Sequence, residues 1–97
     1  MVKMGITPVL CRAARGLLGW TQEDLARRSE VVAATIRGYE LGHKVPRRAS
    51  LSSIQRTLGQ AGVTFVNDPK HGMGAFLAIS VQSDNGEAVG AADNPVA

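Results

Sequence analysis

The side chains with the clearest chemistry lie between residues 32 and 48. Arg37 carries a planar guanidinium whose fork matches the O6 and N7 atoms of guanine, although the same group can clamp a phosphate instead. Positively charged residues suited to phosphate binding follow it: Lys44, Arg47 and Arg48. This set of side chains predicts contact with the bases and backbone of double-stranded DNA.

The residues just before Arg37 are small or apolar. Ala33 and Ala34 cannot form hydrogen bonds through their side chains. Their methyl groups can nevertheless contact thymine, and their size lets a helix approach the bases closely. The predicted base-contacting segment consists of Val32, Ala33, Ala34, Thr35 and Arg37.

A short helix is expected to begin after Thr21, whose hydroxyl can accept a hydrogen bond from an orphan backbone N–H. Asp24 stands three residues later, as a shorter equivalent of the Glu or Gln in a capping box. Arg27 and Arg28 place positive charge at the other end of the helix, where its dipole favours it. Thr21 and Gln22 begin a helix that would point at the DNA backbone, which predicts phosphate contacts for both.

A second short helix is expected over residues 33 to about 41. Val32, Ile36 and Tyr39 are spaced four and three apart and indicate one apolar face. Gly42 is expected to end this helix. Two short helices joined by a tight turn form a unit that presents its second helix to a major groove.

Residues 7–60 resemble the phage-repressor and Cro-like helix-turn-helix family, often called Xre-type regulators. Gln22 matches the glutamine that opens the motif, Ala26 the small residue at the helix crossing, and Ile36 the apolar residue that locks the second helix down. Residues 42–48 resemble the basic loop that follows the DNA-reading helix. The resemblance implies a four-helix repressor-like domain that binds DNA.

The resemblance also implies a structural ion pair and a strained turn. Arg15 and Glu40 match a pair that forms a buried salt bridge in several members, and it would fix the angle of the second helix. Glu30 stands where the family usually has a turn glycine, so a left-handed backbone there is expected to cost roughly 1 kcal/mol.

Two more helices are expected around the motif. Thr7 and Pro8 fit the N-cap and first position of a helix that Gly19 ends. The expected apolar stripe of this helix is Leu10, Cys11, Ala14, Leu17 and Leu18. A fourth helix is predicted over residues 50–60, where the apolar positions are Leu51, Ile54 and Leu58.

The pattern changes at Gly62. Residues 62–66 and 75–81 are β-prone and are joined by the turn-rich segment 67–74, which predicts a β-hairpin. Both faces of this hairpin are partly apolar, and an isolated two-stranded ribbon is marginal in water. We therefore predict that a second copy of the chain covers it, through Phe65, Phe76, Leu77 and Ile79. In the competing arrangement the fourth helix forms the dimer, and the hairpin is only a lid on its own core.

These patterns divide the chain into a helix-turn-helix domain (1–62), a hairpin for dimerisation (63–81) and a tail (82–97) expected to be disordered. The expected fold class is mainly α with a C-terminal hairpin. Residues 1–60 hold ten Lys and Arg against four acidic residues, a net charge of +6, whereas residues 61–97 carry −3. The positive charge therefore coincides with the motif, which favours a polyanionic partner.

The remaining composition disfavours other kinds of site. Cys11 is the only cysteine, so no internal disulfide is expected, and its apolar-periodic position indicates a core residue. His43 and His71 are far apart and lack neighbouring ligands. We therefore expect no metal, no cofactor and no small-molecule ligand. No signal peptide or membrane-spanning run is found, which predicts no membrane partner and a cytoplasmic location.

We predict a sequence-specific DNA-binding transcription regulator, in its simplest form a dimeric repressor of an inverted-repeat operator. The alternative is a protein-binding module on the same scaffold, such as an antitoxin or an antiactivator, because an alanine-rich helix face also suits a protein partner. We expect no enzymatic activity and name no catalytic residues, because no nucleophile–base set, paired acids or phosphate loop is found.

Overall fold

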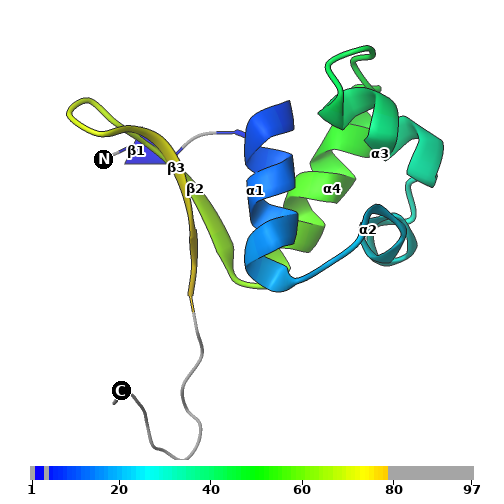
Figure 1. Cartoon of the computed structure of the whole chain (residues 1–97), viewed down its shortest axis with the longest axis horizontal. Coiled ribbons are helices and arrows are strands. Elements are labelled where there is room, and N and C mark those ends of the chain that lie inside the picture. The colour runs from blue at the N-terminus through cyan, green and yellow to red at the C-terminus, as the bar shows by residue number, and fades with distance from the viewer. Residues whose placement is uncertain (1, 4, 79–97) are drawn as a thin grey trace, which may run out of the picture.

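The computed structural model describes residues 2–3 and 5–78. Four helices form one half of the molecule, and an antiparallel sheet forms the other half (Figure 1). The elements are β1 (Val2–Lys3), α1 (Pro8–Leu18), α2 (Gln22–Ser29), α3 (Ala33–Glu40), α4 (Arg48–Gln60), β2 (Val63–Asp68) and β3 (Gly72–Leu77). The expectation of a mainly helical fold followed by a hairpin is confirmed.

The helix ends follow local capping chemistry. The Thr7 hydroxyl accepts from the backbone N–H of Leu10 at 3.2 Å, and Gly19 ends α1 in the left-handed conformation with φ 71°. At α2, Thr21 and Asp24 form a reciprocal capping box in which both hydrogen bonds measure 2.9 Å. Each cap satisfies a backbone group that a helix end leaves without a partner. The predicted starts of α1 and α2 are therefore confirmed.

The turn between α2 and α3 passes through Glu30, which has a φ of 61°. It is the one non-glycine residue with positive φ in the described chain. A side chain with a Cβ atom is disfavoured there, because Cβ crowds the following carbonyl oxygen. The turn therefore has the left-handed backbone expected for it, but it lacks the glycine that would remove the steric cost of a Cβ atom.

The residue after this turn corrects one prediction. Val31 is buried, whereas Val32 is 68% exposed and precedes the first residue of α3. The four-and-three spacing assigned Val32 to the apolar face together with Ile36 and Tyr39. The turn shifts the phase of the chain, so Val31 enters the core instead. Leu17, predicted on the inward stripe of α1, is likewise 44% exposed.

The hairpin differs from its predicted boundaries. Its strands pair from Val63 opposite Leu77 to Asp68 opposite Gly72, so the connecting turn is shorter than the predicted segment 67–74. Residues 67, 68 and 72–74, which were predicted to lie in the turn, belong to the two strands instead. The shorter turn is closed by the side chain of Asp68, which accepts a hydrogen bond from the backbone N–H of Lys70 at 3.1 Å. The predicted second strand beyond residue 78, including Ile79, and the predicted tail at 82–97 lie outside the described residues.

A third strand was not predicted. β1 pairs antiparallel with β2, with Val2 opposite Asn67 and Lys3 opposite Val66, and the sheet order is β1-β2-β3. A two-residue strand has too few positions to show alternation in sequence. Only its partner, more than 60 residues away along the chain, identifies it.

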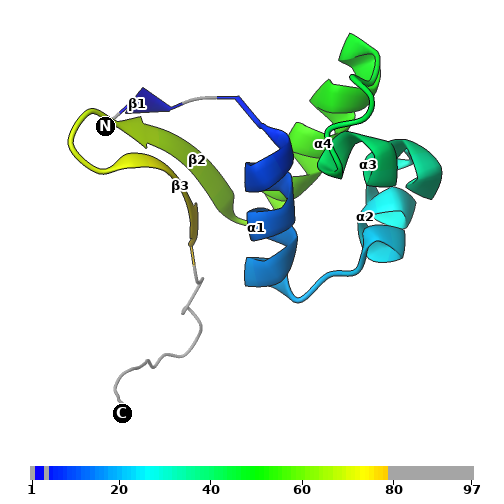
Figure 2. The ribbon, with the colours of Figure 1, turned by 45° about the horizontal axis from the view of Figure 1, so that its top comes forward.

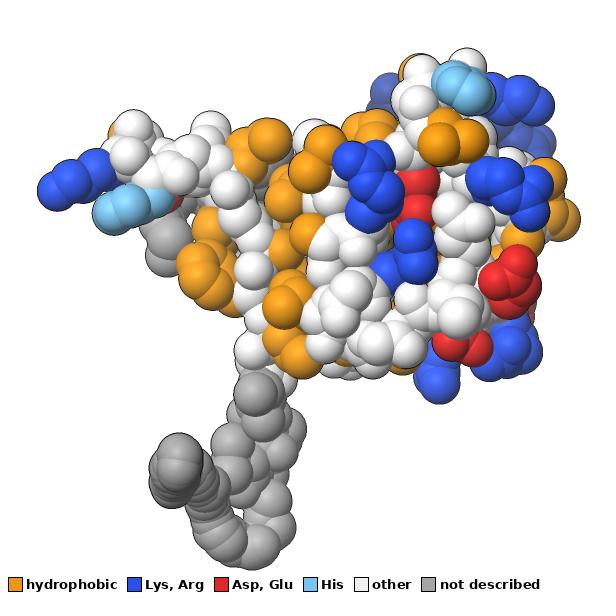
Figure 3. Space-filling view, viewed as in Figure 1, with side chains coloured by type: hydrophobic (Ala, Val, Ile, Leu, Met, Phe, Trp, Pro, Cys, Tyr) orange, Lys and Arg blue, Asp and Glu red, His pale blue; other side chains and the backbone are white. Residues whose placement is uncertain are grey.

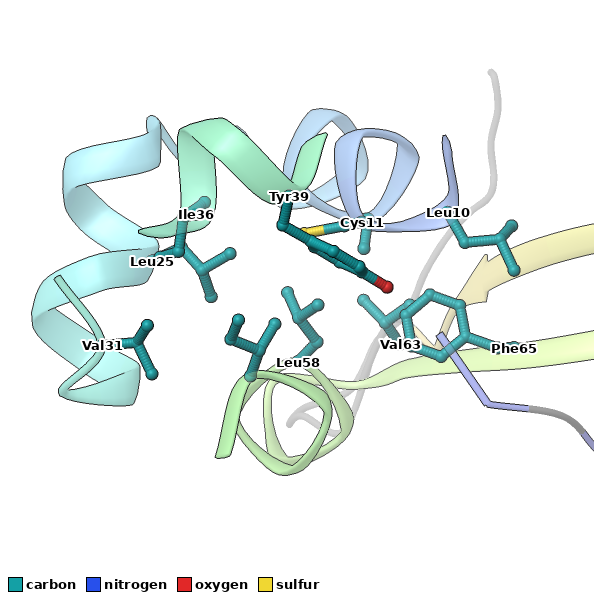
Figure 4. Packing of buried hydrophobic residues seen from close by; sticks show 11 residues of the cluster. Leu10, Cys11, Leu25, Val31, Ile36, Tyr39, Leu58, Val63 and Phe65 are labelled. Carbon is teal, nitrogen blue, oxygen red and sulfur yellow. The ribbon is translucent and has the colours of Figure 1, made fainter. Parts of the chain in front are cut away.

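One face of the sheet closes the helical core (Figure 4). Val63 and Phe65 are 4% and 3% exposed, and they belong to one core cluster with buried side chains from all four helices. The fully buried members of this core include Cys11, Ala14, Leu25, Ile36, Ile54 and Leu58. The prediction that Phe65 lies in a dimer interface is therefore wrong, because its ring is buried within its own chain. Phe76 lies on the opposite face of the sheet and is 54% exposed.

The strained turn yields a stability prediction. Glu30→Gly should raise the free energy of unfolding by about 1 kcal/mol, because glycine adopts positive φ without a Cβ clash. Denaturant unfolding followed by circular dichroism measures the change. Gln55→Gly, at an exposed position inside α4, is the matched control and should lower stability by about 1 kcal/mol. Equal destabilisation in both variants would show that the turn stores no strain.

Candidate nucleic-acid interface

The helices α2 and α3 lie side by side at the end of the molecule away from the sheet (Figure 2). Ile36, Tyr39 and Glu40 are the buried residues of α3 and fix which side of it faces the core. Ala34 and Arg37 are exposed on the other side, and Leu41 is 61% exposed just beyond the helix end. The spacing of three and four between these residues is that of one helix face. We call this face, with Val32 and Ala33, the outer face of α3.

The predicted base-contacting residues divide by exposure. Val32, Ala34 and Arg37 are exposed, whereas Ala33 and Thr35 are half-buried. Arg37 is therefore the fully exposed side chain with hydrogen-bonding groups on α3. The outer face is otherwise made of methyl and methylene groups.

The loop after α3 carries the predicted phosphate-binding residues. Lys44, Arg47 and Arg48 are all exposed, and Arg48 is the first residue of α4. The backbone N–H groups of His43 and Lys44 both donate to the carbonyl oxygen of Gly38, at 2.9 and 3.2 Å. The loop thus folds back on the end of α3. Figure 3 shows Lys and Arg side chains gathered over this end of the molecule.

The close packing of this loop uses the small size of Gly38. A Cβ atom at this position would come within 3.4 Å of the Lys44 side chain. The stem of Lys44 therefore lies over the helix where a side chain is missing. This contact places a positive charge beside the outer face of α3.

The start of α2 is used differently from what its sequence suggests. Thr21 is exposed, but its hydroxyl is engaged in the capping box. The side-chain amide of Gln22 donates to Glu40 Oε1 at 3.0 Å, so it points at the end of α3. Gln22 thus has a structural partner, Glu40, that was not predicted from the sequence. The phosphate contact predicted for Gln22 would have to use groups of this residue that are not engaged with Glu40.

The carboxylate of Glu40 joins three helices. Arg15 on α1 donates to it twice, from Nε at 2.8 Å and from Nη2 at 2.7 Å. Gln22 on α2 and the thiol of Cys11 on α1 complete the set, the thiol at 3.1 Å. The Glu40 side chain is 1% exposed and that of Arg15 is 18% exposed. The structure therefore contains the ion pair between these two residues that the family resemblance implied.

Arg12 adds a contact that was not predicted from the sequence. Its guanidinium donates to the backbone carbonyl oxygen of Glu40, at the last residue of α3. Carbonyl groups at a helix end lack partners within the helix, and positive charge there also suits the helix dipole. Its spacing of three from Arg15 places both arginines along one side of α1, which was the available sequence signal.

These contacts determine the ionisation of the buried groups. Burial would raise the pKa of Glu40, but the hydrogen bonds from Arg15, Gln22 and Cys11 outweigh it, and the pKa is lowered. Burial, reinforced by the hydrogen bond to Glu40, raises the pKa of the Cys11 thiol. The thiol is therefore a neutral donor to a carboxylate, in agreement with its prediction as a core residue.

Two further contacts hold α2 against its neighbours. The guanidinium of Arg28 lies 4.6 Å from the centre of the Trp20 ring, a cation–π distance. The Ser53 hydroxyl on α4 donates to the carbonyl oxygen of Ser29 at 2.6 Å. Neither contact belongs to a sequence motif, so the sequence does not predict them. Together they fix the end of α2 from which the turn begins.

Other kinds of site receive no support from the described residues. Within residues 2–3 and 5–78, no group of three or more His, Cys, Asp or Glu side chains is placed to hold a metal ion. Among the helices of this part of the chain, none has the length and apolar character needed to cross a membrane.

The lowered pKa of Glu40 predicts a pH-dependent stability. The stabilising effect of the ionised carboxylate is complete above its unfolded pKa, near 4.5, and is lost as pH falls through the lower folded pKa. Glu40→Gln should therefore cost about 3–5 kcal/mol at neutral pH, and this cost should shrink as the solution becomes acidic. Denaturant unfolding of both proteins between pH 7 and about pH 3 measures the difference.

Asp24→Asn is the matched control for that experiment, because it removes a carboxylate that is 31% exposed and whose pKa is also lowered, through bonds to Thr21 and Arg27. Its effect should be smaller, since exposed ion pairs are weak. A difference between wild type and Glu40→Gln that stays constant with pH would contradict the assignment of an ionised, buried Glu40.

Comparison with known families agrees with this geometry. A helix-turn-helix family model matches residues 12–61, which is just over half of the chain and includes α2, α3, their turn and the basic loop. A search of curated proteins finds no match to the chain. With an exposed second helix, a basic loop behind it and this match, the chain belongs to the helix-turn-helix family of Cro-like, Xre-type DNA-binding regulators.

Proposed function

We propose that this protein is a sequence-specific transcription regulator that binds an inverted-repeat operator as a homodimer and acts as a repressor. One observation carries the proposal. The outer face of α3 is exposed, has basic residues directly behind it, and is held at a fixed angle by the contacts of Glu40. An exposed helix of fixed orientation beside positive charge is what insertion into a major groove requires.

In the proposed complex α3 lies in the major groove. Arg37 reads a guanine through its two parallel donors, and a bidentate contact of this kind discriminates by about 1–3 kcal/mol. Lys44, Arg47 and Arg48 neutralise phosphates on one side of the groove, and Thr21 approaches the backbone on the other side. Phosphate contacts position the helix, whereas base contacts supply the specificity.

The proposed dimer uses the sheet. Phe76 is exposed on the outer face of β3, and β3 is the last strand of the sheet, so its outer edge has no partner strand among residues 2–3 and 5–78. Exposed aromatic side chains and free strand edges are features that a second copy can cover. Leu77 is half-buried against the core and would contribute only at the margin of the interface. The two-fold axis would place two α3 helices on successive turns of one DNA face.

Repression follows from occupancy of the operator. A dimer on promoter DNA excludes other proteins from that DNA, and its affinity for the operator sets the concentration at which it acts. A protein of this function works in the compartment that holds the DNA, and the location proposed for it is the cytoplasm.

A protein-binding module is the second candidate, and a separate observation favours it. Val32, Leu41 and Val45 are 68%, 61% and 87% exposed around α3. A shallow hollow of about 370 Å³ lies beside Val32, at the turn between α2 and α3. Val32 lines this hollow together with Ala26, Val31 and Ala33. Exposed apolar side chains suit a protein partner. Selection of bound sequences from random duplex DNA separates the two functions, because equal affinity for selected and random DNA would exclude a sequence-specific regulator.

Two arginines should respond differently in that assay. Arg37→Ala should relax sequence preference at one position per half-site by about 1–3 kcal/mol, while Arg48→Ala should weaken binding to all sequences alike. Arg48→Ala should also reduce the slope of log affinity against log salt by about one. Binding isotherms at several salt concentrations measure both effects. If Arg37→Ala weakens binding uniformly and leaves preference intact, Arg37 is a phosphate contact.

A charged substitution tests the proposed dimer interface. Phe76→Glu should give a folded monomer that binds DNA poorly, because two like charges would meet at the two-fold axis. Met73→Glu is the matched control, since Met73 is 53% exposed on the other face of the same strand. Sedimentation and circular dichroism follow assembly and folding. A Phe76→Glu protein that stays dimeric with full DNA affinity would exclude this interface and favour α4.

A further inference from the structure

The outer face of α3 lacks hydrogen-bonding groups apart from Arg37. Its exposed members are Val32, Ala34, Arg37 and Leu41, with Ala33 half-buried beside them. On the core side of the helix, Glu40 is fully engaged with Arg15, Gln22 and Cys11. Very little of the donor and acceptor pattern of a base pair can therefore be read by this helix. The specificity has to come from another chemical feature of the bases.

We propose that α3 reads thymine methyl groups, with Val32, Ala33 and Ala34 forming an apolar surface for the C5 methyl of thymine, next to a guanine read by Arg37. The proposal rests on the regulator function proposed above and specifies the DNA that it selects. It makes these three apolar residues determinants of specificity.

The chemistry of the major groove favours thymine at this surface. Thymine presents a methyl group there, whereas cytosine presents an amino donor, and guanine and adenine present acceptors or donors. A methyl group gains from burial against Val32 and Ala34. A polar edge buried against the same side chains would lose its water without gaining a partner. The surface therefore selects for thymine and against the other three bases.

The small size of the residues makes the contact possible. Ala33 and Ala34 keep the first turn of α3 narrow, so its backbone can lie close to the bases. Contact between methyl groups requires this proximity, because dispersion attraction is significant only near van der Waals distance. The angle of α3 is fixed at its other end by Glu40, which maintains the approach.

The position of Arg37 sets the spacing of the expected site. Arg37 follows Ala34 by three residues on the same face, a rise of about 4.5 Å along the helix. One base-pair step is about 3.4 Å. The longer reach of the arginine then places its guanine one or two base pairs from the thymine. The expected half-site has one or two A·T pairs, with thymine on the contacted strand, next to a G·C pair.

Replacement of thymine by deoxyuridine tests the proposal directly, because uracil lacks the C5 methyl and keeps the hydrogen-bonding edge. The probe is the duplex selected by the purified full-length protein, with each thymine replaced singly. We expect a threefold to fivefold loss of affinity at one or two thymines per half-site, the loss expected for one buried methyl group. Thymines outside the half-sites should show no change.

A second variant assigns the contact to α3. In Ala34→Gly the protein methyl is gone, so replacing the same thymine by uracil should cost much less than in the wild type. Ala13→Gly, an exposed alanine on α1, has the same effect on helix propensity and should retain the full uracil effect. Circular dichroism confirms that both variants are folded at the temperature of the assay.

The possible outcomes test the regulator function and the thymine reading separately. If no sequence is enriched over random DNA, the regulator function fails, and the thymine reading fails with it. If a sequence is enriched but uracil is tolerated at every thymine, the regulator function stands and the thymine reading is overturned. If the uracil effect is unchanged in Ala34→Gly, Val32→Ala and Ala33→Gly, the methyl contact comes from another residue and the assignment to these three is overturned.

Discussion

The carboxylate of Glu40 is the group on which the arrangement of the helices depends. It is almost fully buried, and a buried charge is tolerated only when it is fully paired. Its partners come from α1 and α2, while Glu40 itself ends α3. Satisfying this one charge therefore fixes the relative position of three helices. Arg12 strengthens the same junction by binding the backbone carbonyl oxygen of Glu40.

A fixed α3 matters because its outer face offers few polar groups. A long polar side chain can adjust to a base by changing rotamer, but a methyl group contributes only at short range. The proposed reading of DNA through Val32, Ala33 and Ala34 therefore requires that the rest of the domain hold α3 accurately. The ion pair of Glu40, the cation–π contact at Trp20 and the folded-back basic loop all act on this orientation.

The sheet and the helices form one core but present different surfaces. Val63 and Phe65 bury the inner face of the hairpin against the helices, which holds the sheet at the end of the molecule away from α3. On the outer face, Phe76 remains exposed. This burial pattern supports the proposed division, in which one end contacts DNA and the other contacts a second chain. Leu77 and Phe65 show why strand alternation alone could not assign the interface, because alternation distinguishes two faces but does not identify which one is covered.

The sequence by itself determined the features that depend on neighbouring residues. The caps at Thr7 and Thr21 and the helix end at Gly19 need only contacts within a few residues. The left-handed turn at Glu30 was instead implied by the family resemblance, because local chemistry disfavours it at a residue with a Cβ atom. Tertiary structure decided the features that depend on distant partners. Gln22 turns toward Glu40, Val31 replaces Val32 in the core, and β1 exists only because β2 lies beside it. Local chemistry sets the backbone conformation, but the choice of partner for a side chain or strand depends on which segments the folded chain brings together.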